Sequence, residues 1–464
     1  MGNSISSVTV TGHGSDTCHR RAFLFAGMAA AAGRRALYAD APAPALRTLT
    51  QWLQVSPEMR RRALPSCLDR IRAMEPSIHA WVQVSPQMPA GRGSLSEIPY
   101  GVKDIVETRG LATEYGSPIY KGRIGTADAA IIRELRKHGA LLLGKTQTTA
   151  FAYQTPAPTR NPRNAEHTPG GSSSGSAAAI AADMVPFTVG EQTRGSVLRP
   201  ASFCGVTGFK PTFGLLSMEG VLPLSRSLDT LGFFTHTPND MAALWSALGH
   251  AAGRAEDFEF GAPEPMPDCD PAMAAAFQES LTRLRRAGLS IRSLDVAGTL
   301  AKIAEANLTV MLYEGARFHR QRYEEYGDRL ADLADLVRQG LRISVDRYNE
   351  ALRYIGSEKT QFAELFKRTP VILTPAAVGP ARGAFACQPI FSRLQGAVVT
   401  SVKGWVPPPK TPYCTGSNTL LLPCPLTPTE SVALVPESEV SEKWNWMAST
   451  PIRPGAAAAL SGAI

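Results

Sequence analysis

A small-residue loop and a following turn carry the residues whose types could do chemistry. The first, residues 170–176, reads GGSSSGS and runs directly into the alanine-rich stretch 177–182. The second, residues 193–196, reads TRGS and follows the apolar run 185–189, which favours a buried strand. A Gly/Ser loop at the N-terminus of a helix presents backbone N–H groups to an anion or an oxyanion. The alternative, a flexible linker, is rarely joined directly to an apolar helix.

Residues 169–214 resemble the signature segment of the amidase signature family. The family pattern is GGSSxGS, followed further along by GxxTxGS[IV][RL]xPAxxCGxxGxKPT. Here Ser172 and Ser196 lie 24 residues apart, as the bridging and nucleophilic serines of that family do.

Three further segments extend this resemblance. Residues 98–104, IPYGVKD, resemble the segment that bears the family's catalytic lysine and place Lys103 69 residues before Ser172. Residues 144–152 and 220–232 fit two other family segments. The match is continuous over about residues 60–250 and thin through about residue 385.

The resemblance implies a serine hydrolase mechanism. Ser196 would be the nucleophile, Ser172 the proton bridge and Lys103 the base. An amine accepts a proton only when it is neutral, so Lys103 must lose its charge through burial or cationic neighbours. The family holds its bridging serine through a cis peptide bond, here Gly171–Ser172.

The resemblance also implies an oxyanion hole and substrate contacts. The oxyanion hole would consist of the backbone N–H groups of Thr193, Arg194, Gly195 and Ser196. Ser173 and Arg199 are the candidate substrate-binding residues. Ser173 could instead hydrogen-bond within its own loop, and Arg199 could be a structural ion-pair donor instead of a ligand for an acyl-side carboxylate. We expect Asp229 to be a structural hydrogen-bonding residue, and His167 and Cys204 to pack.

The chain departs from the family pattern in three places. The common GTDTGGS or GTQTAGS reads GEQTRGS here, so Glu191 replaces a small hydroxyl residue and Arg194 replaces glycine or alanine. Arg194 could favour an anionic substrate or obstruct the pocket. Residues 386–464 resemble nothing in the family, and their proline clusters oppose central-strand pairing. We expect a largely irregular tail there.

One motif points to a different chemistry and fails on physical grounds. Residues 139–146 satisfy the GxxxxGK[ST] pattern of a phosphate-binding loop. That function requires a loop whose backbone curls round phosphates, whereas the intervening Ala-Leu-Leu-Leu favours a buried strand. We therefore reject nucleotide hydrolysis.

Strand patterns that alternate with helical patterns predict an α/β fold. The resemblance implies a mixed β-sheet core covered by helices on both sides. Predicted helices are 50–80, 129–138, 177–182, 271–287, 300–325 and 328–355, and predicted strands are 140–143, 185–189 and 371–376. The predicted domains are an N-terminal extension (1–43), a catalytic domain (44–385) with a helical insertion at about 265–365, and a proline-rich tail (386–464).

The N-terminal extension resembles a twin-arginine export signal. Residues 19–33 read HRRAFLFAGMAAAAG, and the small residues Ala39 and Ala41 flank a possible cleavage site. Arg34 and Arg35 interrupt that pattern. Localisation therefore stays open between export and the cytoplasm.

Composition excludes several classes of protein. Hydrophobic residues make up 44% of the chain, which excludes wholesale disorder, and the longest apolar runs are too short to predict an integral membrane segment. The net charge of +8 comes mostly from residues 1–76, so nucleic-acid binding is not favoured. The seven cysteines and eight histidines show no metal-binding spacing, so we expect no metal and no disulfide framework.

The sequence thus predicts an amidase that cleaves a small-molecule carboxamide to an acid and ammonia or an amine, through an acyl-enzyme on Ser196, with no metal or cofactor. The first alternative is the glutaminase (A) subunit of a tRNA-dependent amidotransferase, which shares the triad and requires partner chains. The second is a catalytically impaired family member that acts only in binding. A homodimer remains open.

Overall fold

The structure is a computed structural model that describes residues 45–89, 91–250 and 259–383. The chain divides into two units, residues 1–44 and 45–464, and all described residues belong to the second. The predicted export signal and the predicted irregular tail therefore lie outside the described residues.

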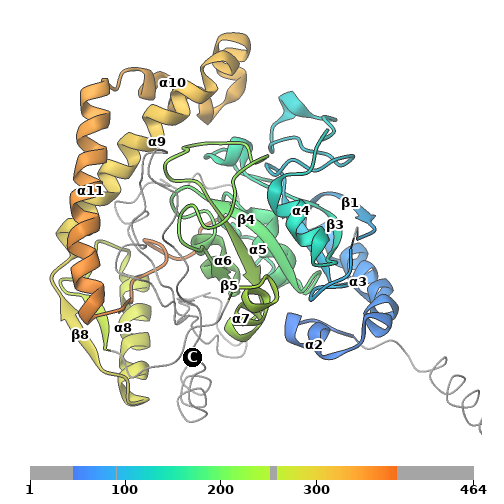
Figure 1. Ribbon diagram of the computed structural model, residues 1–464. Coiled ribbons are helices and arrows are strands. Elements are labelled where there is room, and N and C mark those ends of the chain that lie inside the picture. Colours follow the sequence, from blue (N-terminus) through green and yellow to red (C-terminus); the bar gives the residue numbers. More distant parts are fainter. Residues whose placement is uncertain (1–44, 90, 251–258, 384–464) are drawn as a thin grey trace, which may run out of the picture. The chain divides into compact units, whose positions relative to one another are not determined.

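A six-stranded mixed sheet carries the candidate site (Figure 1). Its strands are β1 (Trp81–Gln87), β2 (Pro99–Lys103), β3 (Leu141–Thr146), β4 (Phe187–Gln192), β5 (Thr207–Phe209) and β6 (Thr230–Thr235), in the order β1-β3-β2-β4-β6-β5. Strand β2 pairs in parallel with both β3 and β4, and the other pairs are antiparallel. Every residue of β2, β3 and β4 is buried, as in strands covered on both faces. The predicted mixed α/β architecture is confirmed.

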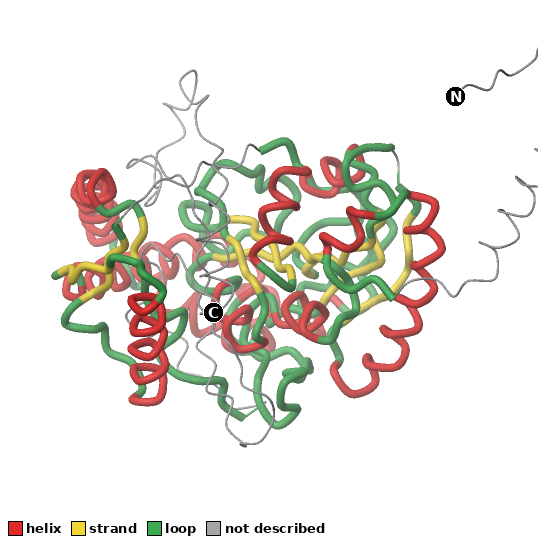
Figure 2. The backbone as a smooth tube through the Cα atoms, turned by 90° about the horizontal axis from the view of Figure 1, so that it is seen from below, coloured by secondary structure: helices red, strands yellow, loops and turns green. Residues whose placement is uncertain are grey.

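Helices lie on both sides of this sheet (Figure 2). They are α2 (Leu49–Gln54), α3 (Pro57–Ile78), α4 (Ala130–Lys137), α5 (Ser174–Ala181), α6 (Leu198–Cys204) and α7 (Pro238–Ala247). The single helix predicted at 50–80 is wrong, because the chain forms two. Ser56 accepts a hydrogen bond from the backbone N–H of Met59 and Pro57 occupies the first turn, which together start a new helix.

The segment after β6 adds a second, three-stranded parallel sheet and long helices. Its elements are β7 (Phe260–Pro263), α8 (Pro271–Arg286), β8 (Ile291–Leu294), α9 (Ala297–Tyr326), α10 (Asp332–Leu341), α11 (Val345–Arg368) and β9 (Val371–Ile372), with strand order β8-β7-β9. The single helix predicted at 328–355 is wrong, because Ser344 caps a new helix. The strand predicted at 371–376 is confirmed only for its first two residues.

The rejected phosphate-loop motif forms strand β3, as its apolar residues predicted. Lys145 within it is fully buried. Its Nζ donates to the Val106 carbonyl oxygen and, over 3.1 Å, to Thr113 Oγ1. The Asp104 carboxylate lies 3.7 Å away. This lysine is therefore a buried structural cation.

Helix α5 approaches the sheet closely because its residues are small. All residues from Ser174 to Ile180 are buried, and the Gly175 N–H donates to the Gln147 carbonyl just beyond β3. A Cβ added at Gly175 would lie 2.1 Å from the Ala80 carbonyl oxygen and 2.4 Å from the Gln147 nitrogen. Both atoms belong to the backbone and cannot rotate away.

Gly175→Ala should therefore lower the free energy of unfolding by about 1–3 kcal/mol, because the helix must move away from the sheet. Gly356→Ala in α11 is the matched control, since its added Cβ meets nothing within 4 Å. That variant should gain up to about 1 kcal/mol from helix propensity. Urea unfolding of both variants measures the expected loss of stability in Gly175→Ala and the expected gain in Gly356→Ala. Equal stabilities would contradict this account of the packing.

Candidate active site

Lys103 is the last residue of β2, and its side chain is completely buried. Its Nζ donates to Ser172 Oγ over 2.6 Å. It also donates to Glu191 Oε2 over 2.8 Å and to the Glu191 carbonyl over 3.2 Å. Strands β2 and β4 run parallel, so their carboxyl ends meet at one edge of the sheet and bring Lys103 beside Glu191. The structure therefore joins two of the three predicted catalytic residues directly.

Ser172 lies in the loop that leads into α5 and is 1% exposed. The Gly171–Ser172 peptide bond is cis, as the family resemblance predicted. The Ser172 carbonyl accepts a hydrogen bond from the Thr149 N–H over 3.1 Å. These contacts fix the hydroxyl that faces Lys103.

Ser196 lies in the turn between β4 and α6. The Gln192 side-chain oxygen accepts hydrogen bonds from the N–H groups of Val197 (2.9 Å) and Leu198 (3.1 Å), which folds this turn back onto the strand. The Ser173 N–H donates to the Ser196 carbonyl over 3.3 Å, so the two serine loops are in contact. Within the described part of the chain the Ser196 hydroxyl itself has no hydrogen-bond partner. Such a hydroxyl is available to a substrate.

The backbone of the second loop fits the oxyanion hole predicted for it. Among the described residues, the N–H groups of Thr193, Gly195 and Ser196 donate to no acceptor. The Arg194 side chain is buried, and its Nη2 donates to the Ala304 carbonyl of α9 over 3.3 Å. Burial lowers the pKa of this guanidinium to about 10, and the charge of Arg199 adds to the effect. The oxyanion role stays a prediction.

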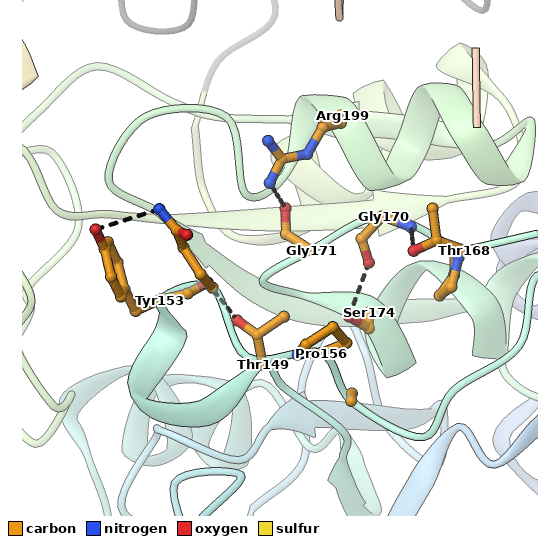
Figure 3. A pocket seen from close by; sticks show the side chains of 11 residues that line it. Thr149, Tyr153, Pro156, Thr168, Gly170, Gly171, Ser174 and Arg199 are labelled. Atoms are coloured by element: carbon orange, nitrogen blue, oxygen red, sulfur yellow. Dashed lines mark hydrogen bonds between the residues drawn. The ribbon is translucent and has the colours of Figure 1, made fainter. Parts of the chain in front are cut away.

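The two candidate substrate-binding residues both contact backbone. Ser173 is fully buried, and its hydroxyl donates to the Glu191 carbonyl of β4 over 3.1 Å, not within its own loop as expected. Arg199 Nη2 donates to the Gly171 carbonyl over 2.5 Å. Figure 3 shows this guanidinium above Gly171, at a small pocket of about 40 Å³ that Tyr153 and Thr168 also line.

Sequence reasoning marked Glu191 as a departure but gave it no partner. Its Oε1 lies 3.1 Å from Thr193 Oγ1, which lies 2.7 Å from Asp229 Oδ1. The other oxygen of Asp229 accepts hydrogen bonds from the N–H groups of Leu224 and Ser225. The structural hydrogen-bonding role predicted for Asp229 is confirmed. A chain of polar groups, buried except for the half-buried Thr193, thus runs from Lys103 to Asp229.

Burial and neighbouring charges both shift the pKa values of Lys103 and Asp229, and for Lys103 they act in opposite directions. Burial lowers the pKa of Lys103, whereas the carboxylate of Glu191 raises it, as does the charge of Asp229 to a smaller extent. Burial raises the pKa of Asp229 well above its usual range, and the neighbouring charge of Glu191 adds to that rise. Each cause is the expected one for groups removed from water.

Comparison with known proteins identifies the family. The family model named Amidase matches residues 62–257. The glutamyl-tRNA(Gln) amidotransferase (A) subunit of Pelobacter propionicus is 32% identical over 392 residues, which cover 69% of this chain and 79% of that protein. The chain belongs to the amidase signature family. The corresponding protein of Thermotoga maritima is 30% identical, over 70% of this chain and 71% of its own.

Solved structures of this family agree with the fold. A crystal structure described as an amidase superposes with a TM-score of 0.65 at 25% identity and covers 72% of this chain and 83% of its own. The crystal structure of the Thermotoga maritima protein, the same amidotransferase (A) subunit, superposes with a TM-score of 0.63 at 26% identity, over 75% of this chain and 83% of its own.

The described residues 45–89, 91–250 and 259–383 also bear on other classes of site. No helix among them is long and apolar enough to cross a membrane. They contain no cluster of His, Cys, Asp and Glu side chains that could bind a metal. The described cysteines Cys67, Cys204 and Cys269 are free thiols. Cys204 is buried, and its Sγ contacts the Pro169 carbonyl, which agrees with the packing role predicted for it.

Arg199→Ala tests the two roles considered for this residue. The Gly171 carbonyl would lose its guanidinium donor, so we expect the free energy of unfolding to fall by about 1–3 kcal/mol. Arg133→Ala is the matched control, because that arginine forms an exposed ion pair with Glu219 and should lose at most about 1 kcal/mol. Chemical denaturation measures both. Equal stability of the two variants, with a raised KM for a carboxylate-bearing amide only in Arg199→Ala, would instead favour a substrate-binding role.

Proposed function

We propose that this chain cleaves a small-molecule carboxamide through an acyl-enzyme on Ser196. The observation that carries the proposal is the completely buried Lys103, whose Nζ lies 2.6 Å from Ser172 Oγ in the loop that contacts Ser196. A serine hydroxyl is too weak a nucleophile to attack an amide unaided, and a neutral lysine relayed through a second hydroxyl can activate it.

The first half of the reaction forms the acyl-enzyme. Ser196 Oγ bonds to the amide carbonyl carbon while its proton passes to Ser172, and the Ser172 proton passes to Lys103 Nζ. The negative charge that develops on the carbonyl oxygen is stabilised by backbone N–H groups of residues 193–196. As the tetrahedral intermediate collapses, the carbon–nitrogen bond breaks, and the proton returns through Ser172 to the departing ammonia or amine.

The second half regenerates the enzyme. A water molecule attacks the ester carbonyl, and its proton follows the same path to Lys103. When the ester bond to Ser196 breaks, the proton returns to the serine oxygen and the carboxylic acid leaves. All steps use side chains and backbone of this chain, and the amide and water supply every atom of the products.

A second candidate function is the glutaminase subunit of a tRNA-dependent amidotransferase. The names of the curated relatives at 30–32% identity favour this candidate over a free-standing amidase. Both functions use the same cleavage of a carboxamide, and they differ in the destination of the ammonia and in the need for partner chains. A third candidate, a family member that only binds, is suggested by the unfamiliar sequence after residue 385.

Ser196→Ala should abolish both amide turnover and covalent labelling by a fluorophosphonate, because no other group can form the acyl-enzyme. Lys103→Met, which keeps the length of the side chain but cannot accept a proton, should lower the rate by about 10²–10⁴-fold. Ser196→Ala should unfold at nearly the wild-type denaturant concentration, since only a hydroxyl is lost. Labelling of the Ser196→Ala protein at the wild-type rate would overturn the assignment, and an unlabelled wild type would favour the binding-only candidate.

Ammonia release by the isolated chain separates the first two candidates. A free-standing amidase should hydrolyse members of a panel of aliphatic, aryl and malonyl-type amides without any added protein. A glutaminase subunit should release ammonia from glutamine only weakly until purified partner subunits of the amidotransferase and their tRNA are added. Substantial turnover of a simple amide by the chain alone, unchanged by those additions, would rule out the subunit function.

A further inference from the structure

The base has an acidic neighbour that belongs to this chain and not to the family pattern. Glu191 stands where the common GTDTGGS text has a small hydroxyl residue. Its Oε2 lies 2.8 Å from Lys103 Nζ, and the two side chains are 2% and 0% exposed. Water therefore screens neither charge, and the attraction between an ammonium and this carboxylate is much stronger than at a surface.

Both oxygens of the Glu191 carboxylate have defined partners. One faces Lys103, and the other lies 3.1 Å from the Thr193 hydroxyl. The Glu191 N–H also lies 3.3 Å from Ser173 Oγ, so the backbone at this residue is held as well. The carboxylate is thus fixed against the amine and cannot swing into water.

The other titratable groups on the elements around the site do not contact the amine of Lys103, although the charge of Asp229 raises its pKa to a smaller extent than Glu191 does. Asp104 follows Lys103 at the end of β2, and its carboxylate lies 3.7 Å from Lys145 of β3. Because successive side chains of a strand point to opposite faces of the sheet, Asp104 lies on the face away from Glu191. Before β6, Asp229 binds Thr193 and two backbone N–H groups. From α9, Glu314 accepts hydrogen bonds from the hydroxyls of Ser225 and Ser227 and from Tyr348.

Two nearby arginines, Arg194 in the turn after β4 and Arg199 in α6, donate to backbone carbonyls. The Arg194 guanidinium binds the Ala304 carbonyl, and the Arg199 guanidinium binds the Gly171 carbonyl. Among the described residues, Glu191 is the one ionisable side chain in direct contact with Lys103 Nζ.

We propose that Glu191 stabilises the protonated form of Lys103 and thereby raises the pH above which Lys103 can act as the base. The inference rests on the proposed function, because the protonation of Lys103 governs turnover only if Lys103 is the base. Burial alone would favour the neutral amine, and Glu191 opposes that effect. An amine that still carries its extra proton donates to Ser172 and cannot accept the proton of that hydroxyl.

The sign of the effect follows from the charge. The reactive form is the deprotonated lysine, so activity rises as pH increases through the pKa of Lys103. Removing the carboxylate removes the interaction that favours the ammonium, so the acidic limb of the pH–rate profile must move to lower pH. A purely structural role of Glu191 would change the rate at all pH values without moving the limb.

The test is the rate of fluorophosphonate labelling from about pH 5 to 10 for wild type, Glu191→Gln and Glu191→Thr. The glutamine keeps the size and an acceptor oxygen, and the threonine restores a small hydroxyl residue. In both, the midpoint of the acidic limb should fall by at least about one pH unit, so labelling below the wild-type midpoint should be about tenfold faster. Glu314→Gln, a carboxylate that does not contact Lys103, is the control whose midpoint should stay at the wild-type value.

Several results would overturn the inference. One is an unchanged or higher midpoint of the acidic limb in a folded Glu191 variant. Another is labelling that is slower at every pH without a shift of that midpoint. If neither variant folds, a wild-type profile that is flat between about pH 6 and 9 overturns it as well. The proposed function fails separately, if Ser196→Ala still becomes labelled.

Discussion

The arrangement of the site depends on one constraint, a lysine amine that is fully removed from water at the carboxyl edge of two parallel strands. Such a group is stable only when its hydrogen-bonding capacity is used, whether it is charged or neutral. The partners of Lys103 are a hydroxyl from the loop before α5 and a carboxylate and carbonyl from β4. The parallel pairing of β2 with β4, and the close approach of α5 that Gly175 permits, bring these partners within reach. Strand register and helix packing are therefore requirements of the site.

A second lysine, on the adjacent strand, is equally buried but has different partners. Lys145 is as deeply buried as Lys103, and burial lowers its pKa to about 8. Its partners are a backbone carbonyl, two threonine hydroxyls and the Asp104 carboxylate, whose own pKa burial raises to about 6. None of these groups belongs to either of the two serine loops, residues 170–176 and 193–196. The difference between the two lysines lies in the partner, because only Ser172 belongs to a loop that contacts Ser196.

Local sequence patterns predicted much of the fold, but two helix caps and the contacts between residues far apart in the sequence were missed. The apolar run in residues 140–143 and the amphipathic pattern in 129–138 identified β3 and α4, whereas the cap residues Ser56 and Ser344 were overlooked and two long helices were predicted where four form. The order of Lys103, Ser172 and Ser196 was available from motifs. The contact between Lys103 and Glu191, residues 88 apart in the chain, was not, because it exists only through the register of β2 on β4. The carboxylate at position 191, where the family pattern has a small hydroxyl residue, was the one signal that pointed to it.

The two unusual residues of segment 190–196, Glu191 and Arg194, have related effects on its backbone. Glu191 and Arg194 replace small residues, and both side chains are buried. Glu191 attaches one end of the loop to the amine at the end of β2, and Arg194 attaches the next turn to the Ala304 carbonyl of α9, in the segment after β6. A loop with small residues at both positions would have neither attachment. Oxyanion stabilisation requires N–H groups that are already oriented before charge develops. Glu191 and Arg194 thus restrain the backbone between them, which includes Thr193. They do so through buried ionisable side chains, which the family pattern lacks at these two positions.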